Sequence, residues 1–199
     1  KAEFAQTEGP AFGQANSTDG GFTFDTIATQ GQAGVKADAY RVEGAINLSE
    51  ISSKEGRLSA YFDHQDSGFS GANRQVAGEV ERWGASGSLT LSEDTRVSAQ
   101  IDEQESTLRG KSRAVYADVA HNFTDSTSVT AGVRYDDLQV SAGTFNSAID
   151  GARIDLSLQI EHKTSADGRF YAFGQGTLDN EDSRSANNRF GVGGNVRVN

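Results

Sequence analysis

The sequence lacks several features that would point to common protein classes. Its 199 residues include no cysteine, no methionine and a single proline. Without cysteine there is no disulfide framework, no thiolate nucleophile and no cysteine-based zinc site. No run approaches the roughly 18 to 20 apolar residues of a transmembrane helix, so a helical membrane protein is excluded.

Positive charge is also scarce. The chain has 18 Lys and Arg against 28 Asp and Glu, a net charge of −10. A nucleic-acid binder carries a basic stripe instead, so we do not expect a nucleic-acid partner. No basic segment followed by an apolar one opens the chain, so we expect any export signal to have been removed already.

What the sequence does have is strict alternation of apolar and polar residues from about residue 40 onward. Ile154, Leu156, Leu158 and Ile160, for example, alternate with charged or polar neighbours. Period-2 alternation is typical of β-strands with one apolar and one polar face. Nine strands are predicted, at residues 40–48, 57–67, 82–91, 96–104, 113–123, 128–137, 152–163, 169–178 and 188–198.

The first 39 residues carry a weaker signal, and we treat 1–39 as a separate, largely irregular region ahead of the sheet at 40–199. Phe22–Ile27 and Gly34–Ala39 either add strands or extend the strand that begins at Tyr40. Residues 1–20 are predicted to be irregular.

The connections between strands alternate in length. Short turns are predicted at residues 92–95, 124–127 and 164–168, and a somewhat longer one at residues 49–56. Longer polar loops are predicted at residues 68–81, 105–112, 138–151 and 179–187. An up-and-down antiparallel sheet places all short turns at one end and all long loops at the other, as outer-membrane barrels do.

Alternation alone fits either a soluble sandwich or a membrane barrel. Three observations favour the barrel: strands long enough to cross a bilayer, local connections that suit a closed meander, and aromatics near strand ends. The aromatics that would form interfacial girdles are Trp83, Phe123, Tyr135, Phe170 and Phe190. The charged residues that would face the barrel interior are Arg96, Asp102, Asp118, Arg134, Asp136, Arg153, Asp155, Arg169 and Arg197.

The segments WGASGSLTLSEDTRVSAQID, AVYADVAHNFTDSTSVTAGVRYDD and RFGVGGNVRV resemble strand–turn–strand hairpins of Gram-negative outer-membrane β-barrels. The resemblance covers roughly residues 40–199, and it extends loosely to the barrel portion of large exported surface proteins. It implies an all-β, up-and-down antiparallel meander of about 8 to 10 strands that closes into, or forms part of, a transmembrane β-barrel. It also implies an outer-membrane location at the cell surface, with membrane lipid and lipopolysaccharide as partners.

One departure from that family concerns the end of the chain. Such barrels usually finish on an aromatic residue, whereas this sequence stops at Val198 and Asn199. Nine strands is also an odd number, and bacterial single-chain barrels have an even count. Either the amino-terminal region adds a strand, or the chain is part of a longer barrel with further strands or subunits, which is the interpretation we favour.

No residue pattern predicts catalysis, a metal site or a cofactor. His64, His121 and His162 share the parity of apolar neighbours near strand ends, which suits an interfacial position better than a catalytic one. The acidic stretches at 136–137 and 179–182 lack the spacing of a calcium loop and are expected to be solvated.

The sequence therefore predicts a non-enzymatic outer-membrane barrel component, with a passive pore or a surface-anchoring role. Opposite charges on the inner face either filter permeant ions or pair and fill a narrow interior. The alternative is a soluble or cell-surface β-rich adhesin or structural module that does not enter a membrane.

Overall fold

The structure is a computed structural model that describes residues 1–9, 15–16, 25–26, 35–71, 74–75, 78–140, 150–164, 168–181 and 184–196. Within this part of the chain the secondary structure is β, apart from one turn of 3-10 helix, η1 (Leu48–Glu50). Among the described residues, no helix has the length and apolar character needed to span a membrane.

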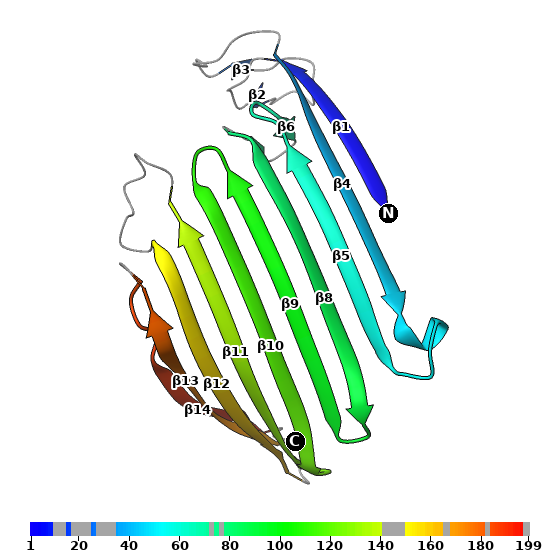
Figure 1. The fold of residues 1–199 in the computed structure, drawn as a ribbon, viewed down its shortest axis with the longest axis vertical. Helices are drawn as coiled ribbons and strands as arrows, with labels where there is room; N and C mark the ends of the chain where they lie inside the picture. The colour runs from blue at the N-terminus through cyan, green and yellow to red at the C-terminus, as the bar shows by residue number, and fades with distance from the viewer. Residues whose placement is uncertain are drawn as a thin grey trace.

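The main element is a single ten-stranded antiparallel sheet in the order β1-β4-β5-β8-β9-β10-β11-β12-β13-β14 (Figure 1). Its strands are β1 (Ala2–Gly9), β4 (Val35–Asn47), β5 (Gly56–Gln65), β8 (Val80–Ser92), β9 (Thr95–Ser106), β10 (Gly110–Thr124), β11 (Thr127–Gln139), β12 (Gly151–Lys163), β13 (Arg169–Asn180) and β14 (Arg189–Asn195). Two small ribbons pair β2 (Ala15–Asn16) with β3 (Asp25–Thr26) and β6 (Ser70–Gly71) with β7 (Arg74–Gln75).

This topology confirms the predicted all-β, up-and-down meander. Each strand of the main sheet pairs with the strand before and after it, and β1 and β14 occupy the two edges. The sheet is not closed into a ring. Figure 1 shows one long, curved layer in which β13 and β14 turn out of the plane of the other strands.

The amino-terminal region differs from the prediction. Residues 2–9, which were expected to be irregular, form β1 and pair with β4 from Ala2 opposite Val42 to Gly9 opposite Val35. The local pattern is weak because Phe4 is the one large apolar side chain in this strand, so the pairing with β4 determines its conformation. Residues 35–39 extend the strand at Tyr40, as one of the two alternatives proposed for Gly34–Ala39. Gly34 and most of Phe22–Ile27 lie outside the described residues.

The predicted short turns at 92–95 and 124–127 are confirmed, because β8 leads directly into β9 and β10 into β11. The predicted long loop at 105–112 is wrong. Glu105 pairs with Lys111 and Ser106 with Gly110, which leaves three connecting residues. Gly110 has a φ of 87°, a conformation that glycine adopts without steric cost, so the chain can reverse there.

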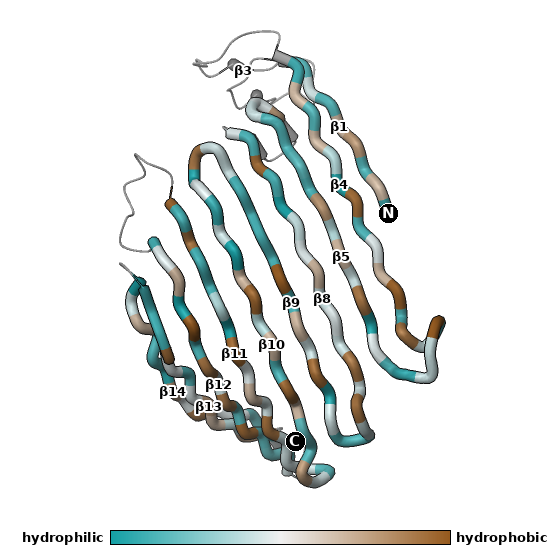
Figure 2. The backbone as a smooth tube through the Cα atoms, in the orientation of Figure 1, coloured by the Kyte–Doolittle hydropathy of each residue, from teal (hydrophilic) through white to brown (hydrophobic). Residues whose placement is uncertain are grey.

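The register sorts the side chains onto two faces. One row across the sheet contains Leu89, Val97, Val119, Ala131, Leu158 and Gly174. The adjacent row, on the opposite face, contains Ser88, Ser98, Asp118, Gly132, Ser157 and Gln175. We call these the apolar face and the polar face. Figure 2 shows the resulting alternation of hydrophobic and hydrophilic positions along the strands.

The burial of the two faces is the reverse of that in an ordinary soluble domain. Ala37 is the one buried hydrophobic residue among those described, whereas Asp63, Asp136 and Asp155 are buried. On the apolar face, Leu158 is 49% exposed to solvent. In the described part of the chain the sheet therefore has no apolar core between layers, and three of its buried side chains are carboxylates.

Candidate functional site: the two faces of the sheet

The apolar face forms a band of limited height. Its apolar runs extend over Trp83–Leu91 in β8, Val115–Phe123 in β10 and Ile154–Ile160 in β12. These lengths approach or match the roughly 9 to 11 residues with which a tilted strand crosses a bilayer. The apolar band is therefore seven to nine residues of strand in height.

Charged side chains bound this band at the loop end of β9, β10 and β11. On the parity of the apolar face, Glu103 lies 2.8 Å from the Lys111 ammonium and 2.5 Å from an Arg113 guanidinium nitrogen. The change from apolar to ion-paired residues takes place within one step of the alternation, between Val115 and Arg113. The apolar face therefore has a defined border at this end.

The aromatics predicted as girdles lie at different heights. Trp83 pairs with Phe62 in the part of β8 nearest the long loops, and Tyr135 lies toward the same end of β11. Phe123 and Phe170 lie beside the short turns at the other end. Phe190 pairs with Gly174 in the middle of β13 and is 93% exposed.

Sequence reasoning missed a second aromatic group on this face. Tyr40 stacks on Phe62 with ring centroids 5.9 Å apart and on His64 at 4.9 Å. These three residues come from the paired strands β4 and β5. Phe62 and His64 had the right parity, but their contact with Tyr40 depends on the register between strands, which a single sequence does not contain.

The three histidines are held separately. His121 Nδ1 lies 2.9 Å from Thr95 Oγ1, and His162 Nδ1 lies 2.9 Å from Thr127 Oγ1, both next to short turns. His64 is at the opposite end of its strand, with Nε2 3.0 Å from Asp66. Among the described residues, no group of three or more His, Cys, Asp or Glu side chains is arranged to hold a metal ion.

Asp66 lies just beyond the end of β5, where its two oxygens have different partners. The backbone N–H of Asp38 donates to one oxygen at 2.9 Å, and the His64 ring lies 3.0 Å from the other. These contacts, first the backbone hydrogen bond and then that to His64, lower the pKa of the Asp66 carboxyl below its ordinary 3.8. The carboxylate thus ties the end of β5 to β4.

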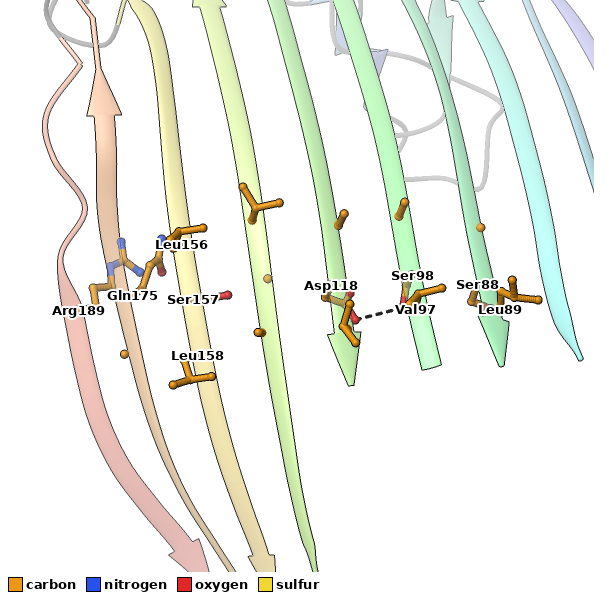
Figure 3. A pocket seen from close by; sticks show the side chains of 18 of the residues that line it. Ser88, Leu89, Val97, Ser98, Asp118, Leu156, Ser157, Leu158, Gln175 and Arg189 are labelled. Atoms are coloured by element: carbon orange, nitrogen blue, oxygen red, sulfur yellow. Dashed lines mark hydrogen bonds between the residues drawn. The ribbon is translucent and has the colours of Figure 1, made fainter. Parts of the chain in front are cut away.

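A groove of about 1340 Å³ runs across the apolar face (Figure 3). Small residues on several strands leave room for it, and larger ones such as Leu89, Leu156 and Leu158 rise beside it. The small residues of this face in the groove are Gly87, Ala99, Ala117, Ala131 and Gly174.

The polar face is crosslinked by ion pairs centred on two aspartates. Asp136 receives two hydrogen bonds of 2.9 Å from Arg134 Nε, and it lies 3.5 Å from Arg153 and 3.9 Å from Arg184. Asp155 accepts hydrogen bonds from Arg153 Nε at 3.0 Å and from the Thr177 hydroxyl at 2.7 Å. This network ties β11, β12 and β13 to the segment that follows β13.

The charged residues predicted for the barrel interior share the polar face wherever the structure describes them. Arg134, Asp136, Arg153 and Asp155 come together in the network above. The others have separate local partners: Arg96 with Ser88, Asp102 with Tyr61 and Gln100, Asp118 with Ser98, and Arg169 with Glu161. Arg197 lies outside the described residues.

Sequence reasoning missed Tyr61 and Arg184 as members of this face. The Tyr61 hydroxyl donates to Asp102 across Gly84 at 2.8 Å, and Arg184 lies in a loop rather than in a strand. The position of Tyr61 could have been predicted, because it is next to Phe62 in the strand and therefore lies on the opposite face. No local pattern indicates that a loop residue returns to the sheet.

No protein-family model, curated protein or solved structure matches this chain. The fold defines a class of its own kind: an open, ten-stranded antiparallel meander with one apolar and one polar face.

Proposed function

We propose that this chain forms wall strands of a bacterial outer-membrane β-barrel, with its apolar face against lipid and its polar face toward the interior. The role is passive and structural. Together the ten strands form a membrane anchor of the kind that displays loops at the cell surface.

The observation that carries this proposal is the reversed burial of the two faces. In water, exposed apolar surface costs about 25 cal/mol per Å², and the apolar face includes Leu156, Leu158 and Ile160, each more than two-fifths exposed. Against hydrocarbon that cost disappears. Charged side chains on the lipid face are unfavourable, so charge is expected on the interior side of such a wall.

The two edge strands add a second argument. Unpaired backbone N–H and C=O groups are not tolerated in the hydrocarbon region, so every strand there needs a partner on both sides. Because the sheet has an even number of strands, β1 and β14 run antiparallel to each other. They can be paired with each other or with further strands or subunits.

The interior charges favour anchoring over conduction. The arginines around Asp136 and Asp155 are ion-paired, and a ring of about ten strands has a narrow interior that paired side chains can fill. Planar-bilayer recording tests this choice. We expect inserted protein to be silent, and a stable conductance after confirmed insertion would instead favour the pore.

Detergent dependence tests the membrane assignment itself. We expect the purified chain to need detergent or lipid to remain monodisperse, and to run on gels as a compact species that shifts on heating. A chain that sediments as a folded monomer without detergent contradicts the proposal. It would favour the soluble or cell-surface β-rich module.

A further inference from the structure

A second cavity lies on the polar face and is separate from the groove of the apolar face. It has a volume of about 380 Å³ and lies over β8 to β11 near the long loops. Ser112 and Ala114 of β10 provide small side chains between its two walls. Tyr61, Arg82 and Asp102 stand on one side, and the other side is formed by Arg134, Asp136 and Arg184.

Arg82 differs from Arg113, Arg134 and Arg184, which also line this cavity, because each of those three makes an ion pair. The Nε of Arg82 is buried and makes no hydrogen bond to the described residues. Asp63 is directly opposite in the register between β5 and β8, yet the Asp63 carboxylate lies 3.6 Å from Arg41. Arg82 makes no ion pair within the described part of the chain, although it lines a polar cavity.

Four carboxylates line the cavity, and each already has a partner. Glu103 pairs with Lys111 and Arg113, and Asp137 accepts a hydrogen bond from the Gln139 amide. Asp136 is matched by Arg134, with Arg153 and Arg184 also near it. Asp102 accepts hydrogen bonds from the Tyr61 hydroxyl and the Gln100 amide. Among the described residues that line this cavity, Arg82 is therefore the arginine without an ion pair.

We propose that this cavity binds a small oxyanion, a phosphate or a carboxylate group, through the guanidinium of Arg82. Guanidinium presents parallel N–H donors that match both kinds of oxyanion. Arg134 and Arg184, on the facing wall, are paired with Asp136, so the proposed anion contact is assigned to Arg82. The site needs only the folded sheet, so it goes beyond the membrane role proposed above and does not rest on it.

The size of the cavity restricts the ligand. A water molecule occupies about 30 Å³ of liquid, so a 380 Å³ space holds inorganic phosphate with its waters or a short organic acid. Ser112 and Gln104 offer further hydrogen-bonding groups beside Arg82. The apolar methyl of Ala114 leaves room for the rest of an organic ligand.

The test measures binding of two probes, inorganic phosphate by ³¹P NMR and acetate by ¹H saturation transfer, to the full chain in whichever medium keeps it folded. We compare the unaltered protein with R82Q, R82K and R96Q. Arg96 is the matched control, because it lies on the same face but bonds to Ser88 outside the cavity. Far-UV circular dichroism checks that each variant retains its sheet.

We expect saturable binding of at least one probe. The affinity should fall roughly 10- to 100-fold in R82Q, which loses the charge-assisted hydrogen bond to the anion, and stay unchanged in R96Q, which does not touch the cavity. R82K should bind with intermediate strength, because it keeps the charge but loses the paired donors. Binding of phosphate alone or acetate alone identifies the class of oxyanion.

Two results overturn the site: no saturable binding of either probe to the folded chain, or equal binding by the unaltered protein and R82Q. Neither result depends on whether the chain needs detergent to stay monodisperse. A chain that binds the anion but stays monodisperse without detergent retains this site and loses the membrane proposal. A detergent-dependent chain that binds neither probe retains the membrane proposal and loses this site.

Discussion

The two faces of this sheet come from the same strands and the same backbone, but they are packed in opposite ways. On the polar face, Asp155 is 3% exposed and accepts hydrogen bonds from three side chains. On the apolar face, Leu156, the next residue along β12, is 42% exposed. Adjacent residues thus experience two different environments.

This difference shows that burial and hydrophobicity are separate properties. A soluble domain stabilises itself by removing apolar surface from water. Here the ion-pair network around Asp136 and Asp155 links strands on the polar face, whereas Leu156 and Leu158 on the apolar face stay exposed. Substitutions on the two faces should therefore change the free energy of unfolding by different amounts in water and in lipid.

The largest effect is expected from D155A. Removing this carboxylate leaves Arg153, Thr177 and Gln175 without a shared acceptor, and breaking a buried ion pair costs about 3–5 kcal/mol. Denaturant titration measures the loss in the free energy of unfolding. D118A is the matched control, because Asp118 has a single hydrogen bond of 3.3 Å, from Ser98. Equal losses in the two variants would contradict the network.

The next effect is expected from L158R on the apolar face. An arginine facing the middle of a bilayer costs roughly 2–4 kcal/mol, whereas a surface substitution in water changes stability by within about 0.5 kcal/mol. Q159R places the same side chain on the opposite face of the same strand. Unfolding titrations in lipid vesicles should show a loss for L158R that exceeds that for Q159R. The reverse order would contradict our assignment of the two faces.

A smaller effect is expected from Y61F. This variant removes the hydroxyl that donates to Asp102, and a hydrogen bond to a charged group contributes about 1.5–3 kcal/mol. Y116F is the control, because Tyr116 lies on the same face and is 40% exposed. The difference in denaturation midpoint between the two variants measures the hydroxyl's contribution. Identical midpoints would mean that the polar face does not depend on this bond.

The smallest effect concerns Asp66 at the end of β5. Its pKa is lowered in the folded state, so its contribution to stability is present above the ordinary value of 3.8 and is lost as pH falls through the folded value. The carboxylate is partly exposed, which limits the contribution to below about 1 kcal/mol. Stability measured from pH 6 to pH 2 should fall slightly less in D66N than in the unaltered protein. Parallel curves would show that Asp66 does not contribute.

The sequence was enough to predict the sheet and its two faces, because alternation such as Ile154 to Ile160 is a local property that survives in the folded chain. It was not enough to identify β1, since Phe4 alone gives little signal and the strand depends on its pairing with β4. The 105–112 segment was predicted as a loop because it is polar. Instead, β9 and β10 extend into this segment and pair with each other up to a short turn.

The candidate sites show the same limit. The parity of Arg134, Asp136, Arg153 and Asp155 placed them on one face, but which side chains meet depends on the register. The approach of Arg184 to Asp136 depends on the path of the chain after β13. Asp63 lies opposite Arg82 in the register but pairs with Arg41, which the sequence alone does not indicate.

The most direct test of the central claim uses the single tryptophan, Trp83, on the apolar face. Its fluorescence is measured in vesicles containing brominated acyl chains and compared with that of W83F/Y116W, which moves the probe to the polar face. We predict strong quenching by brominated lipid for Trp83 and weak quenching for the probe at position 116. Equal quenching at the two positions, or none at Trp83 in folded and lipid-bound protein, would contradict the account.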